Sequence, residues 1–202
     1  MDHNIIPQIL DIEWDMFHNV NGDSRVGCQN DRETFVAMRT AQFSAWSVRA
    51  VEYYLKDLEA AVSAGRNLVR EKYIRMMKST APFDYIRLEG SLPPVSPEKE
   101  ALIGILWSHF SRQTEDMRKK HPYLAQFGRP LYAREETLGW ASIETYQISE
   151  WMTYSEETLE ALLEHLLELK AKGIDLAYLI QENSVTCLGY ASMEEANNIT
   201  TL

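Results

Sequence analysis

The stretch "NIIPQILDIEWDMFHNV", residues 4–20, carries the pattern that decides the fold. Its apolar residues recur at spacings of three and four positions, as they do along one face of an α-helix. They are Ile5, Ile6, Ile9, Leu10, Met16, Phe17 and Val20. Asn21 and Gly22 then end the pattern, since both residue types favour turns. We therefore expect a helix with one buried face at this point of the chain.

The same periodicity continues through most of the remaining sequence. Asp31 predicts the cap of a long helix from about Arg32 to Ala64, and Gly65 predicts its end. Further helices are expected over about 68–78, 98–118, 143–152 and 156–172, followed by two short ones near the C-terminus. No segment shows the alternation of apolar and polar residues that is typical of a strand.

Two segments interrupt the helical pattern. Residues 81–97 hold four of the seven prolines, and residues 119–142 are irregular and rich in aromatic side chains. Both are expected to be long loops. A chain of 202 residues most simply forms one domain. We predict an all-α single domain over 1–202, a bundle of about seven to nine helices with these two loops.

Net charge and hydropathy exclude several function classes. The net charge of −10 disfavours a nucleic-acid-binding surface, which needs clustered Lys and Arg, and also disfavours anionic membrane surfaces. No run of residues approaches the length of an apolar membrane span. The start, "MDHNIIPQIL", does not resemble a signal peptide. We therefore expect a cytoplasmic protein with neither nucleic acid nor membrane as its partner.

Metal-binding patterns are absent from the sequence. The two cysteines, Cys28 and Cys187, lie far apart, and none of the five histidines has Glu-x-x-His or His-x-x-x-His spacing. We expect no metal site, and the residues identify no cofactor.

Two charged residues fall on apolar helix faces. Glu13 lies within the stripe of the first helix, and Arg39 and Gln42 share a face with Trp46. An unpaired charge in an apolar interior costs several kcal/mol, so we expect Glu13 and Arg39 to pair, with Gln42 bridging them. Such a pair adds little stability, because desolvation offsets the attraction. A functional site is one interpretation, and an Arg39 that reaches solvent from the edge of its helix is the other.

Four further residues are candidates for the same site. Cys28 precedes a helix N-terminus, which would stabilise a thiolate, although a free cysteine is more often a small buried residue. Arg129 lies between a glycine and Pro130, and could pair with Glu150 or complete a pocket with Arg39. The rings of Trp46 and Tyr146 could form pocket walls or belong to the core.

Several motifs resemble those of a bacterial family catalogued as domain of unknown function number 4125. They are "IEWDMFHNV", "GCQNDRETFVAMRTAQFSAW", "YIRMMKSTAPFDY" and "ETYQISEWMTYSEETL", in this order, and the resemblance extends from about Glu13 to Leu159. It implies a natural bacterial domain and no particular mechanism.

We weigh two functional hypotheses. In the first, the chain is a small-molecule-binding domain that could also be an enzyme. Arg39 would bind a carboxylate or another small anion, Glu13 would orient it or act as a general base, and Gln42 would hydrogen-bond it. Glu13 and Arg39 are then the candidate catalytic residues, and Gln42, Trp46, Arg129, Tyr146 and Cys28 the candidate ligand-binding ones. The alternative is a non-enzymatic interaction or accessory module that binds a partner protein.

Overall fold

The computed structural model describes residues 5–20, 31–126, 128–137 and 139–199 of the chain. The all-α prediction is confirmed, since these residues form eleven α-helices and no named strand. The helices are α1 (Ile5–His18), α2 (Arg32–Ser44), α3 (Val48–Ser63), α4 (Leu68–Thr80), α5 (Pro82–Leu88), α6 (Pro97–Lys120), α7 (Pro122–Gln126), α8 (Ile143–Trp151), α9 (Glu156–Ala171), α10 (Leu176–Cys187) and α11 (Met193–Ile199).

Several helix ends follow from local sequence chemistry. Asp31 caps α2 by accepting a hydrogen bond from the Thr34 amide at 3.0 Å. Ser155 caps α9 in the same way through the Thr158 amide at 3.2 Å. After α3 the chain turns through Gly65, whose φ of +68° is a conformation that residues with a side chain rarely adopt.

The single long helix expected over 32–64 is wrong, because the chain turns between α2 and α3. Ser47 has extended backbone angles and its hydroxyl accepts a hydrogen bond from the Ala50 amide at 3.2 Å, which starts a new helix. The turn also buries Trp46, which is only 8% exposed. The apolar spacing continues through the turn, so periodicity alone did not reveal it.

The two expected loops contain more helix than their composition indicated. Pro82 begins α5, a position where a proline loses no intrahelical hydrogen bond, and a short 3₁₀ turn, η2, follows at Glu89–Ser91. The second segment contains α7 and another 3₁₀ turn, η3, at Ala133–Glu135. The additional short helices and the divided helix raise the total to eleven, above the expected seven to nine.

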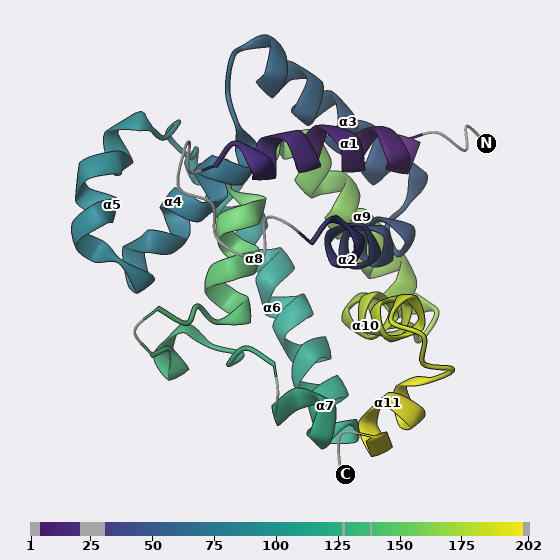
Figure 1. The fold of residues 1–202 in the computed structure, drawn as a ribbon. Helices are drawn as coiled ribbons and strands as arrows, with labels where there is room; N and C mark the ends of the chain where they lie inside the picture. The colour runs from purple at the N-terminus through teal and green to yellow at the C-terminus, as the bar shows by residue number, and fades with distance from the viewer. Residues whose placement is uncertain (1–4, 21–30, 127, 138, 200–202) are drawn as a thin grey trace.

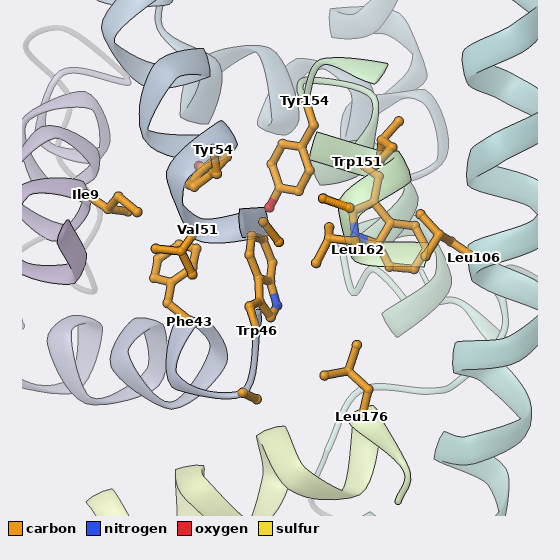
Figure 2. Packing of buried hydrophobic residues seen from close by; sticks show 14 of the residues in the cluster. Ile9, Phe43, Trp46, Val51, Tyr54, Leu106, Trp151, Tyr154, Leu162 and Leu176 are labelled. Atoms are coloured by element: carbon orange, nitrogen blue, oxygen red, sulfur yellow. The ribbon is translucent and has the colours of Figure 1, made fainter. Parts of the chain in front are cut away.

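The longer helices pack around one main apolar core (Figure 1). Helix α1 lies on α2, α3 and α4, while α9 packs on α3 and α6, and α10 on α2 and α6. Helix α8 contacts α4 and α6. Figure 2 shows the centre of this core, where the rings of Tyr54 and Tyr154 lie beside Trp46. A smaller apolar cluster of Val185, Met193 and Ala196 attaches α11 to the body.

A membrane-spanning helix is not found within the described part of the chain, where every helix is too short or too polar for that purpose.

Candidate functional site

A cleft opens between helices α1, α2, α4 and α8, with a volume of about 240 Å³. Its walls are largely apolar and aromatic. They include Phe17, Phe35, Met38, Leu68, Val69 and Tyr73. The Phe17 and Phe35 rings stack on each other with their centroids 5.6 Å apart. An apolar cleft with a few convergent polar groups is the usual form of a small-molecule site.

Arg39, from α2, is the centre of a polar network at one side of this cleft. Its Nε donates to Glu13 Oε2 at 2.7 Å, and its Nη2 donates to the other oxygen of the same carboxylate. Its Nη1 donates to Gln42 Oε1 at 2.7 Å and to Glu150 Oε1 at 2.8 Å. The guanidinium therefore holds two carboxylates at once, in the two-pronged geometry that favours Arg over Lys.

Lys72, from α4, binds the second carboxylate from the other side. Its ammonium donates to Glu150 Oε2 at 2.5 Å and also lies 3.4 Å from the centre of the Tyr146 ring. The side chains of Lys72 and Glu150 are only 9% and 3% exposed. Two cations and two carboxylates thus balance, so the burial of each charge is compensated by a partner.

Two buried tyrosines complete the hydrogen bonds of the carboxylates. The Tyr54 hydroxyl donates to Glu13 Oε1 at 2.5 Å, and the Tyr154 hydroxyl donates to Glu150 Oε1 at 2.6 Å. Both tyrosines are almost fully buried, with 2% and 1% exposure. Glu13 and Glu150 therefore each accept from both a cation and a phenol, which is how buried charge is normally satisfied.

The network holds its members in defined protonation states. Burial alone would raise the pKa of Glu150, but Arg39 and Lys72 hold it well below its ordinary value. Burial alone would lower the pKa of Arg39, and the charges of Glu13 and Glu150 raise it well above the usual range instead. Burial, followed by the adjacent carboxylates, raises the pKa of Tyr54 and of Tyr154, so both phenols stay neutral donors.

The structure brings together several of the residues selected from sequence. The expected ion pair between Glu13 and Arg39 is confirmed, and Gln42 is hydrogen-bonded to Arg39. Gln42 bridges to Glu150, at 3.4 Å, rather than to Glu13. Tyr146 lines the cleft. The roles assigned to these residues stay predictions.

The other candidates lie elsewhere. Trp46 packs in the core, 5.1 Å from Phe43 and 5.9 Å from Tyr54 between ring centres, and does not line the cleft. Arg129 does not form the considered ion pair with Glu150, whose charged partners among the described residues are Arg39 and Lys72.

Arg129 instead donates to the Ala141 carbonyl at 3.0 Å, and its guanidinium lies 5.3 Å from the Tyr146 ring. Arg129 thus contacts Tyr146, a residue of the cleft wall, without lining the cleft itself. Cys28 lies outside the residues that the structure describes.

Sequence reasoning missed Lys72, Tyr54 and Tyr154 as members of the site. A signal for Lys72 exists, because it lies four positions from both Leu68 and Met76, two buried residues of one helix face. This is the same kind of misplaced charge that identified Glu13 and Arg39. The tyrosines gave no such signal, since an aromatic residue on an apolar face is ordinary.

Next to Lys72 the cleft offers mainly hydrogen-bond donors, while the exposed Asp31 carboxylate also lines the cleft. Arg39 and Lys72 both line it, and no hydrogen bond joins the Tyr146 hydroxyl to another residue of the described ranges. By contrast, Glu13 already accepts three of the roughly four hydrogen bonds that a carboxylate can take. Within the described ranges, no group of three or more His, Cys, Asp or Glu residues is arranged to hold a metal.

Comparison with known proteins gives a family and no activity. No curated protein and no solved structure matches the chain. A family model described as "Protein of unknown function (DUF4125)" matches residues 3–198, nearly the whole sequence. The chain therefore belongs to the DUF4125 family of proteins of unknown function.

Proposed function

We propose that this protein binds a small organic molecule in the cleft between α1, α2, α4 and α8. The ligand has a flat apolar body, which packs against Phe17 and Phe35, and a head that accepts hydrogen bonds, a carboxylate or carbonyl group. The observation that carries this proposal is the position of Lys72. Its buried ammonium forms part of the wall of an otherwise largely apolar cleft.

Lys72 is better placed than Arg39 to bind the ligand's head. An ammonium has three N–H donors, and the described residues provide Lys72 with one hydrogen bond, to Glu150, and one contact with a ring face. Arg39 uses four of its five N–H groups within the network. Arg39 therefore orients the carboxylates, while Lys72 and the Tyr146 hydroxyl are free to donate to a ligand.

The size of the cleft agrees with a ligand of one ring and a short polar tail. Its volume of about 240 Å³ is close to the lower limit of small-molecule sites. A molecule of about ten non-hydrogen atoms that gains about 0.4 kcal/mol per atom binds with a Kd of roughly 1 mM. Such a molecule is a suitable probe.

The test uses phenylacetate, phenylacetamide and phenethylamine, which share a ring and differ in the head. Met38 lines the cleft and is 45% exposed, so its ¹³C-labelled methyl group reports binding by NMR. We expect phenylacetate and phenylacetamide to shift the Met38 signal, and phenethylamine to bind at least about tenfold more weakly, a difference of about 1.4 kcal/mol.

A matched pair of variants tests whether Lys72 binds the polar head of the ligand. Lys72→Met should weaken phenylacetate binding at least about tenfold, while Lys78→Met, an exposed position on the same helix, should leave it unchanged. Equal binding of all three probes, or no shift of Met38 with any of them, would contradict the proposal.

A further inference from the structure

A second cleft also lies beside α4 and α8. Its volume is about 730 Å³, and its other walls come from α5, η2, residues 92–95, α6 and η3. Helix α4 contributes Lys72 to the first cleft and Arg75 to the second, while α8 contributes Tyr146 to the first and Ser149 to the second. The two clefts therefore share two helices and differ in their lining.

Arg75 is the notable residue of this second cleft because it has no carboxylate partner. Its Nη2 donates to the Pro93 carbonyl at 2.8 Å, and its Nη1 approaches the Met152 sulfur at 3.8 Å. Its Nε is buried without a hydrogen-bond partner. No ion pair joins Arg75 to an acidic residue of the described ranges.

The cations of the first cleft differ from Arg75, because Arg39 and Lys72 each lie within 2.8 Å of Glu150. The half-buried Arg118 and Arg129 resemble Arg75, since they too donate to backbone carbonyls and form no ion pair within the described ranges. Arg75 is in a less favourable setting, since burial lowers the pKa of its guanidinium and Glu71 only partly offsets this. A half-buried guanidinium that lacks a carboxylate is a position where an anionic ligand can supply one.

The other side chains that line the second cleft indicate which kind of anion it could bind. The apolar side chains are mainly aliphatic, namely Leu92, Pro93, Val95, Ile148 and Met152. Lys78 adds one more positive charge, but Glu89, Glu100 and Glu144 also line the cleft. Three acidic residues against two basic ones would repel a ligand with several negative charges, such as a polyphosphate. A single carboxylate on an aliphatic body fits both features.

We propose that the second cleft binds an aliphatic monocarboxylate, with its carboxylate on Arg75 and its hydrocarbon body against Ile148 and Met152. Ser79, Thr145 and Ser149 also line the cleft and place hydroxyl groups near the same helices. This inference does not rest on the function proposed for the first cleft, because different residues carry it.

The experiment uses octanoate and 1-octanol as probes of the whole chain with ¹³C-methyl-labelled methionines. Met152 lines the second cleft and Met38 lines the first, so the two methyl signals distinguish the sites. We expect octanoate to shift the Met152 signal and leave the Met38 signal in place. The alcohol, which lacks the carboxylate, should bind at least about tenfold more weakly.

Arg75→Gln should reduce octanoate affinity to that of the alcohol, while Arg70→Gln, an exposed position on the same helix, should not. If Arg75→Gln does not fold, the comparison of octanoate with octanol on the unaltered chain still tests whether the carboxylate contributes to binding. Equal affinity for the two probes, an unchanged affinity in a folded Arg75→Gln, or a shift of Met38 in place of Met152 would overturn the proposal.

Discussion

Arg39 and Glu150 are 111 positions apart in the sequence, and Arg39 Nη1 donates to Glu150 Oε1 at 2.8 Å. This bond joins α2 to α8, and it is one part of a larger connection. Glu13 extends the same network to α1, and Lys72 extends it to α4. The buried charges thus fix the relative positions of the four helices that form the first cleft.

The first prediction concerns the central residue of that network. Arg39→Met leaves two buried carboxylates, Glu13 and Glu150, without their shared guanidinium. Removal of one partner from a buried ion pair typically costs about 3–5 kcal/mol, and we expect a loss of this size in the free energy of unfolding. Urea unfolding of the variant against the unaltered chain measures it.

Arg49→Met is the matched control. Arg49 pairs with Glu164, and both side chains are 55% exposed, so this substitution should cost at most about 1 kcal/mol. If the two variants lost equal stability, the Arg39 network would contribute no more than a surface pair, and its charges would need another explanation.

The second prediction concerns the buried phenols. Tyr54→Phe and Tyr154→Phe each remove one hydroxyl that donates to a buried carboxylate and leave the ring in place. Hydrogen bonds to charged groups contribute about 1.5–3 kcal/mol, and each variant should lose about that much. Tyr123→Phe, at a residue that is 44% exposed, should change the unfolding free energy by less than about 0.5 kcal/mol. A loss no larger than that of Tyr123→Phe would contradict the assigned hydrogen bonds.

The third prediction concerns the dependence of stability on pH. The pKa of Glu150 is held far below that of an unfolded chain, so this carboxylate stabilises the fold above the unfolded value, about 4.3. As the pH falls below that value, the unfolded state binds a proton that the folded state does not, and stability decreases. Glutamine has no carboxylate to bind this proton. The unfolding free energy of the Glu150→Gln variant should therefore fall less steeply between about pH 5 and 3 than that of the unaltered chain.

The difference between the two slopes should approach one proton, about 1.4 kcal/mol per pH unit. Urea midpoints measured across this range give both slopes. Parallel curves for the two proteins would show that Glu150 titrates alike in the folded and unfolded states, against the pairing described above.

The sequence predicts a residue of the site only where helical spacing places a charged side chain on an apolar helix face. Glu13 and Arg39 were identified because each falls on the apolar face of its own helix. Their pairing was a simple inference from the cost of burying either charge alone. Glu150 was visible as a charged residue, but its pairing with Arg39 depends on how α8 packs on the rest of the bundle, which no local pattern encodes.

The same limit applies to the fold. Helical periodicity predicted the all-α class, and Asp31, Ser155 and Gly65 predicted three helix ends that the structure confirms. The turn before α3 was not predicted, because the apolar spacing continues through it, although Ser47 is a residue type that favours the N-cap position. Short helices such as α5 gain their stability from their surroundings and leave little periodic signal.

The last prediction separates stability from ligand binding within one network. Lys72→Met removes one of two cations from Glu150, but Arg39 and Tyr154 still donate to that carboxylate. The methionine has a similar length and adds an apolar contact to Tyr146. We therefore expect a loss of about 1.5–3 kcal/mol, smaller than that of Arg39→Met, which leaves Glu13 without any cation, together with the tenfold loss of phenylacetate binding.

Those two measurements on the same purified variant give a clear decision. A small loss of stability with a large loss of binding means that the ammonium is kept mainly for a ligand, as expected for a charge that the fold itself hardly needs. A loss as large as that of Arg39→Met, with binding unchanged, would make Lys72 a structural partner of Glu150 and would remove the main support for the proposed ligand site.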